Sequence, residues 1–117
     1  MDNIAIRCEG LSKQYGDVHA LQPLNLTVPQ GSIFGFLGRN GAGKTTTIRL
    51  LTGLAVPSSG RAWVAGVETT TADSTARSCF GYLPQEPAFY GWMTPLEYLD
   101  YVGKLAQMER LARQRRI

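Results

Sequence analysis

The sequence feature that most constrains this chain is the octapeptide GRNGAGKT, which runs from Gly38 to Thr45. It fits Gly-x-x-x-x-Gly-Lys-[Ser/Thr], a pattern in which glycines let the backbone turn tightly and bring its N–H groups against phosphate oxygens. With the start of the next helix, these N–H groups make a positive site for an anion. Lys44 is expected to reach the β- and γ-phosphates of a nucleotide, and the Thr45 hydroxyl is expected to bind Mg²⁺, which prefers oxygen ligands.

The segments on either side of this loop have the pattern that the motif requires. Residues 32–37 are mostly apolar and are predicted to form a short buried strand. Residues 45–52 are predicted to form a helix, with Gly53 as its stop. A strand, a loop and a helix in this order are the context in which the motif binds phosphate.

Apolar or alternating patterns predict four further strands. They lie at residues 4–8, 21–28, 61–67 and 79–83. Later in the chain, Thr94 and Glu97 form a capping box with proline between them, which predicts the start of a helix. Asp100 and Lys104 are expected to pair on this helix, four residues apart.

The net charge of +3 comes from residues 108–117, which hold four arginines and one glutamate. A charge excess confined to one segment predicts a solvated helix end and no nucleic-acid partner. No apolar run approaches the ~18 residues that span a bilayer, and no secretory signal is recognisable at the start. Cys8 and Cys79 lack metal-ligand spacing and are expected to be small buried hydrophobes of a reduced, cytosolic protein.

Four landmarks, in the same order, resemble the N-terminal half of an ATP-binding cassette (ABC) ATPase, and the resemblance covers nearly the whole chain. Tyr15 resembles the aromatic residue on which adenine stacks. Gly38–Thr45 resembles the Walker A loop, extended by Thr46 and Thr47. Residues 54–60 resemble the stretch that follows the P-loop helix, and residues 82–86 resemble the Q-loop.

The resemblance implies ATP and Mg²⁺ as cofactors and gives each site residue a role. Lys44 and Gln85 are expected to be catalytic, and Thr45 and Gln85 are expected to contact the metal. The glutamine amide both donates and accepts hydrogen bonds, which suits contact with the metal or the attacking water. The residues expected to contact the nucleotide are Tyr15, Gly38, Arg39, Asn40, Gly41, Ala42, Gly43, Lys44, Thr45 and Thr46.

The resemblance also implies an α/β fold, that of a P-loop NTPase of ABC type, here incomplete. Residues 1–85 would form the nucleotide-binding core through the Q-loop, and residues 86–117 would begin a helical subdomain. A transmembrane permease subunit is expected to bind the region after Gln85, and a second ATP-binding subunit is expected to form a dimer. The protein would then lie on the cytoplasmic face of a membrane and energise transport across it.

Several parts of the hydrolytic machinery of ABC ATPases are not recognisable after residue 85. These are the signature loop, the Walker B aspartate, the catalytic glutamate and the switch histidine, since His19 precedes the P-loop. Whether this chain is an enzyme therefore stays open, and little ATPase activity is expected from it alone, because hydrolysis needs charges that hold the metal and the water. A partial parallel sheet is also expected to make the fold marginally stable.

Two alternatives stay open from the sequence. The first is a truncated module that binds nucleotide without turnover. The second is another P-loop NTPase, such as a GTPase or a small kinase. A GTPase would carry an Asn-Lys-x-Asp motif, which is absent, and a kinase would carry a lid with clustered arginines, for which residues 110–116 are a loose candidate.

Overall fold

A computed structural model of the 117-residue chain describes residues 3–38, 43–71, 76–84 and 86–117. The chain divides into two compact units, Met1–Tyr82 and Leu83–Ile117. The first unit contains a β-sheet and the helix that follows the P-loop, and the second contains two helices.

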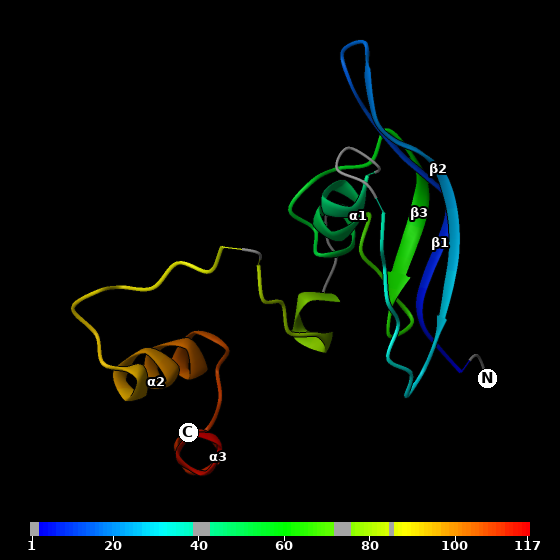
Figure 1. The fold of residues 1–117 in the computed structure, drawn as a ribbon. Coiled ribbons are helices and arrows are strands. Elements are labelled where there is room, and N and C mark those ends of the chain that lie inside the picture. Colours follow the sequence, from blue (N-terminus) through cyan, green and yellow to red (C-terminus); the bar gives the residue numbers. More distant parts are fainter. Residues whose placement is uncertain (1–2, 39–42, 72–75, 85) are drawn as a thin grey trace. The chain divides into compact units, whose positions relative to one another are not determined.

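The first unit is built on an antiparallel sheet with the strand order β2-β1-β3-β4. β1 (Ile4–Tyr15) and β2 (Val18–Pro29) form a long hairpin whose tip projects beyond the rest of the sheet (Figure 1). β3 (Ser59–Val64) runs antiparallel to β1 on its other side, and β4 (Val67–Glu68) is a short strand at that edge. Both neighbours of the central strand β1 are therefore antiparallel to it.

Three of the predicted strands exist, but their ends differ from the prediction. The strands expected at residues 4–8 and 21–28 are longer, because pairing between β1 and β2 continues to the tip of the hairpin. The strand expected at residues 61–67 is interrupted by a tight turn at Ala65 and Gly66, whose φ angles are 52° and 79°. Two successive positive φ angles match the twist of a two-residue hairpin, which separates β3 from β4.

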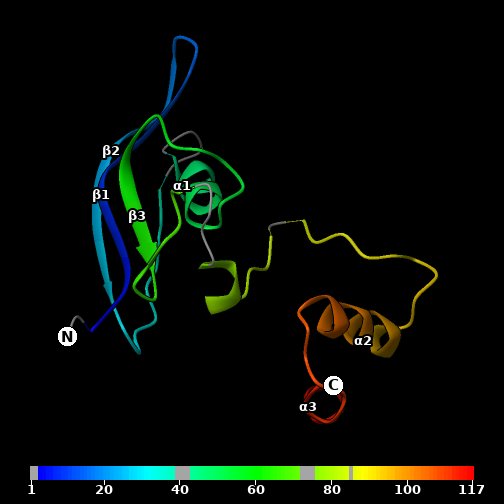
Figure 2. The same cartoon turned by 180° about the vertical axis from the view of Figure 1, so that it is seen from behind.

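α1 (Lys44–Leu51) lies against one face of the sheet, as the opposite views in Figures 1 and 2 show. Thr52 caps its C-terminus, and Gly53 follows with a φ of 77°, so both the predicted helix and its glycine stop are confirmed. The helix and the sheet enclose the hydrophobic core, whose buried members are Cys8, Leu11, Leu21, Leu50, Leu51 and Ala62.

The strand predicted at residues 32–37 is not a strand in the structure. Phe34 and Phe36 line an apolar cavity of about 130 Å³ between the sheet and α1, whereas the side chains of Ile33 and Leu37 are 104% and 93% exposed. The segment thus keeps the alternation of a strand, but even its inward face is only partly covered, because Phe34 is still 48% exposed. An apolar run of this kind suits a strand buried on both faces by parallel neighbours, and the described residues provide none beside it.

The strand predicted at residues 79–83 is also wrong. Residues Ala76–Cys79 form a short 3-10 helix, η1, and residues 80–84 have no regular secondary structure. Cys79, which was expected to be buried, is exposed. A short apolar run does not by itself specify a strand, because its ladder partners lie elsewhere in the chain.

The second unit contains α2 (Pro95–Leu105) and α3 (Arg110–Arg116). The predicted capping box is confirmed, because the Glu97 N–H donates to the Thr94 hydroxyl and the Thr94 N–H donates to the Glu97 carboxylate, each at 3.2 Å. In the part of the chain that the structure describes, no helix has the length and apolar character to cross a membrane.

The side chain of Arg113 in α3 contacts α2 by passing over Gly103. The predicted pair of Asp100 and Lys104 is confirmed at 3.0 Å, and Arg113 of α3 also donates to Asp100 at 2.6 Å. The Arg113 side chain reaches Asp100 by passing over Gly103, where an added Cβ would lie 2.8 Å from its Cγ. Gly103 therefore lowers the helix propensity of α2 but allows α3 to pack on it.

Candidate functional site

The described part of the predicted phosphate loop consists of its two ends, Gly38 and residues 43–46. The other predicted loop residues and the Q-loop glutamine lie outside the described residues. They are Arg39, Asn40, Gly41, Ala42 and Gln85.

Gly43 forms the junction between the loop and α1, and only glycine fits there. Its φ of 94° is left-handed, which side chains rarely tolerate. A Cβ at this position would also lie 2.8 Å from Cδ1 of Leu21 and 3.0 Å from the carbonyl oxygen of Ala20. Gly43 thus brings the start of α1 directly against β2.

The first turn of α1 presents backbone donors at the loop. The first helical hydrogen bond of the backbone runs from the Thr47 N–H to the Gly43 carbonyl at 2.8 Å, so the N–H groups of residues 44–46 precede it. The Gly43 cap supplies no side chain to them, and the first turn contains no acidic residue. Thr47 adds a buried hydroxyl bond of 2.7 Å to the same carbonyl, which fixes this turn. The helix end therefore keeps its positive character.

Lys44 joins the two described ends of the loop. Its ammonium donates a hydrogen bond to the carbonyl of Gly38. Thr45 is exposed and Thr46 is half-buried. The positive charge and the two hydroxyls are thus gathered at the N-terminal end of α1.

A groove of about 480 Å³ runs beside this end of the helix. One wall is formed by residues 43–46, and the other by Val18, His19 and Ala20 at the start of β2. These three residues are not among the site residues predicted from the sequence. The available signal was their position between Tyr15 and the buried part of β2, but their contact with the loop depends on the approach of Gly43 to β2.

Tyr15 lies at the end of β1, paired with Val18 across the hairpin. Its side chain is 51% exposed, and the ammonium of Lys13 lies 4.8 Å from the centre of its ring. The structure therefore puts the predicted aromatic residue next to the strand that forms one wall of the groove, on the hairpin tip.

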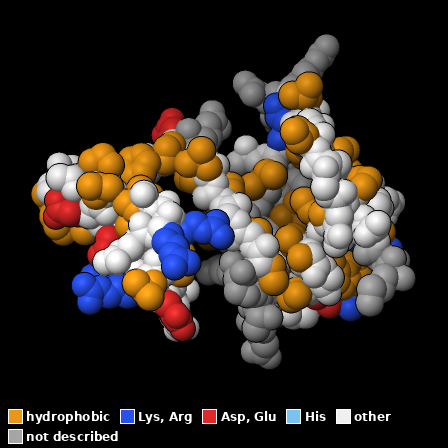
Figure 3. Space-filling view, turned by 90° about the horizontal axis from the view of Figure 1, so that it is seen from below, with side chains coloured by type: hydrophobic (Ala, Val, Ile, Leu, Met, Phe, Trp, Pro, Cys, Tyr) orange, Lys and Arg blue, Asp and Glu red, His pale blue; other side chains and the backbone are white. Residues whose placement is uncertain are grey.

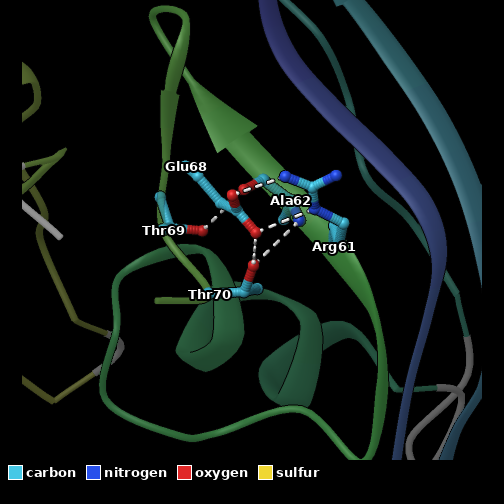
Figure 4. A network of polar contacts seen from close by, with 5 residues as sticks. All are labelled: Arg61, Ala62, Glu68, Thr69 and Thr70. Atoms are coloured by element: carbon cyan, nitrogen blue, oxygen red, sulfur yellow. Dashed lines mark hydrogen bonds and ion pairs between the residues drawn. The ribbon is translucent and has the colours of Figure 1, made fainter. Parts of the chain in front are cut away.

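A network of polar contacts links β3 to β4 and to the residues that follow it (Figure 4). Arg61 makes two hydrogen bonds to the Glu68 carboxylate, at 3.0 and 2.8 Å, and the Thr70 hydroxyl adds a third at 2.9 Å. These bonds, those from Arg61 first, lower the pKa of Glu68 to about 2. In the core, burial raises the pKa of the Cys8 thiol to about 11, so it stays protonated.

Comparisons with known proteins show the family to which the chain belongs. Residues 21–117 match the family model described as ABC transporter. The chain is 44% identical over 100 residues to an uncharacterized ABC transporter ATP-binding protein of Synechocystis, and the match covers 86% of this chain and 28% of that protein. It is 38% identical over 114 residues to the probable multidrug ABC transporter ATP-binding protein YbhF of Escherichia coli, covering 92% and 20%.

The structural comparison agrees. A solved ATP-binding subunit of an ABC transporter superposes with a TM-score of 0.83 at 28% identity, over 96% of this chain and 47% of that one. The chain thus spans less than a third of each of these two curated relatives and about half of the solved subunit. Its fold is that of part of a P-loop NTPase of ABC type, and the chain belongs to the ABC transporter family of ATP-binding proteins.

Proposed function

We propose that this chain binds ATP as part of the nucleotide-binding domain of an ABC transporter, and that ATP hydrolysis by the complete subunit energises transport across a membrane. The observation that carries the proposal is the packing of Gly43 against β2. It leaves the first-turn N–H groups of α1, the Lys44 ammonium and the groove side by side. A helix N-terminus with an adjacent lysine is suited to bind a polyphosphate.

The donor set also fits the expected cofactors. In this proposal Lys44 exchanges its bond to the Gly38 carbonyl for the β- and γ-phosphates, and Tyr15 stacks on the adenine. Thr45 and Gln85 would hold Mg²⁺, which when bound would neutralise phosphate charge. The remaining predicted loop contacts belong to the same proposal; they are Gly38, Arg39, Asn40, Gly41, Ala42, Gly43 and Thr46.

The partners follow from the same family membership. We propose that a transmembrane permease subunit binds the region after Gln85, and that a second ATP-binding subunit forms a dimer with the complete protein. The protein would then act at the cytoplasmic face of the membrane.

Titration calorimetry of the 117-residue chain with Mg-ATP tests the proposal. Saturable binding is expected, and Lys44→Ala is expected to weaken it by about tenfold or more, because a hydrogen bond to a charged group contributes ~1.5–3 kcal/mol. Lys104→Ala is the matched control, since it removes a lysine from α2 of the second unit.

The control variant should bind Mg-ATP as the unmodified chain does. Equal affinities of the unmodified chain and Lys44→Ala would contradict the proposal. Circular dichroism of both variants should show unchanged secondary structure, so that a loss of binding reports the site.

A further inference from the structure

The tip of the hairpin formed by β1 and β2 has a lysine with two contacts. Lys13 Nζ donates to the carbonyl of Val56 at 2.5 Å and also lies 4.8 Å from the centre of the Tyr15 ring. The ammonium is therefore fixed by a backbone acceptor and at the same time presented to an aromatic face. Such a cation is attracted by the negative face of the ring.

The Val56 carbonyl belongs to the loop between α1 and β3, residues 52–58. This loop is hydrogen-bonded to the hairpin at a second point. The backbone N–H of Gln14 donates to the Ser58 hydroxyl at 2.8 Å, and the Ser58 N–H donates to the Ser12 carbonyl at 2.9 Å. At its other end the loop follows α1, where the Ala55 N–H donates to the carbonyl of Arg49 at 3.2 Å. The loop is thus hydrogen-bonded to both the hairpin and the P-loop helix.

These contacts connect the two ends of the candidate site. α1 carries the phosphate end and the hairpin carries Tyr15, and Lys13 contacts both the ring and the loop between them. We propose that Lys13 is a positioning residue, which holds the Tyr15 ring in the orientation that stacks on the base of a bound nucleotide. The inference rests on the proposed function, in which Tyr15 receives the adenine.

The physical reason is pre-organisation. Tyr15 is 51% exposed and lies at a hairpin tip, so its ring would have to lose rotational freedom when a base stacks on it. A ring already held by the ammonium loses less freedom on binding. The effect should concern the base alone, because in this arrangement Lys13 contacts the ring and a backbone carbonyl, and the phosphate donors come from the P-loop.

Titration calorimetry with two ligands separates these roles. Mg-ATP carries the base and the phosphates, whereas Mg-tripolyphosphate carries phosphates alone. Lys13→Met keeps an unbranched side chain and removes the ammonium, and should weaken Mg-ATP binding about three- to tenfold while leaving Mg-tripolyphosphate binding unchanged. Lys13→Arg should retain most of the ATP affinity, because a guanidinium also stacks on aromatic rings and donates hydrogen bonds.

Two further variants complete the test. In a chain that already carries Tyr15→Ala, Lys13→Met should not weaken Mg-ATP binding further, because Lys13 acts on the base only through the Tyr15 ring. Lys104→Met makes the same substitution on α2 and should change neither affinity. Comparison of Lys13→Met with Lys104→Met separates the effect of losing a positive charge from the effect of losing the contact with Tyr15.

Two outcomes would overturn the inference while the proposed function stands. Equal weakening of both ligands by Lys13→Met would mean that the lysine contacts phosphate or supports the fold as a whole. Unchanged ATP affinity in Lys13→Met would mean that the ring needs no support. Failure of the proposed function differs from both, because the unmodified chain and Lys44→Ala would then bind each ligand equally, and the inference would fall with it.

Discussion

Glycines that make room for another part of the backbone fix the geometry of the first unit. At Gly60, where φ is +83°, a Cβ would overlap the carbonyl of Gly10 and lie 2.5 Å from the backbone nitrogen of Leu11. β3 therefore passes β1 at a distance that only a missing side chain permits. Gly43 acts in the same way between α1 and β2, so the shape of the groove depends on it.

A pair of glycine substitutions tests this reading. Gly31 also has a positive φ, +71°, but an added Cβ would meet no atom within 4 Å. Gly31→Ala should therefore cost only the strain of the left-handed backbone, ~1–2 kcal/mol. Gly60→Ala should cost about 1–3 kcal/mol more, because backbone atoms must move. Urea denaturation followed by circular dichroism measures both, and equal losses would contradict the crowding argument.

The two cysteines should differ in reactivity. Cys8 is 2% exposed and its pKa is raised to about 11 by burial, so little of the nucleophilic thiolate forms. Cys79 is exposed. At pH 8, Ellman's reagent should label one thiol rapidly and the second only after unfolding, and Cys79→Ser should remove the rapid phase. A rapid phase that persists in Cys79→Ser would mean that the core opens readily.

Among the elements, those specified by nearby residues could be predicted from the sequence, and those specified by distant partners could not. α2 was predictable because Thr94 and Glu97 cap each other across a single turn. The segments at 32–37 and 79–83 were not, because an apolar run becomes a strand only when another strand pairs with it. The wall of the groove at residues 18–20 was missed for the same reason, since it depends on a contact with Gly43.

The Glu68 carboxylate, on the hairpin of β3 and β4, should make the stability of the fold depend on pH. In the folded chain Arg61 and Thr70 lower the pKa of Glu68 from 4.5 to about 2, so as the pH falls the unfolded chain takes up the proton first. The stabilisation is complete above pH 4.5 and is lost as the pH falls towards 2. Glu68→Gln should lower the Tm at pH 7, and the difference from the unmodified chain should shrink between pH 4.5 and 3. A difference that stays constant would contradict this assignment.

At the scale of the whole molecule, many large apolar side chains of the described residues face solvent. In the first unit, Ile33 and Val56 are 104% and 72% exposed, and in the second, Leu83 and Trp92 are 79% and 74% exposed. Figure 3 shows hydrophobic side chains at the surface of both units. Apolar patches of this kind usually mark surfaces that contact other polypeptide segments.

The chain studied alone should therefore behave as a protein with accessible apolar surface. We expect it to bind the dye ANS under native conditions, and to self-associate as its concentration rises in sedimentation velocity experiments. Mutating Ile33 and Leu37 to threonine should reduce both dye binding and self-association, because these are the most exposed large apolar side chains of residues 32–37. A chain that stays monomeric without dye binding would contradict the expectation.

The strand order also predicts the order in which the elements form during folding. Tyr15 and Val18 pair across a two-residue turn, so the hairpin can form within about 1–10 μs. β3 must instead find β1 from far along the chain, since Ser12 and Ser59, which contact each other, are 47 residues apart, and closing so long a loop is slower. α1 lies within that loop. We therefore expect the hairpin of β1 and β2, which carries Tyr15, to form early. α1, with the phosphate-binding end of the site, should pack against it only when β3 pairs with β1, so this step would bring the two ends of the nucleotide site together.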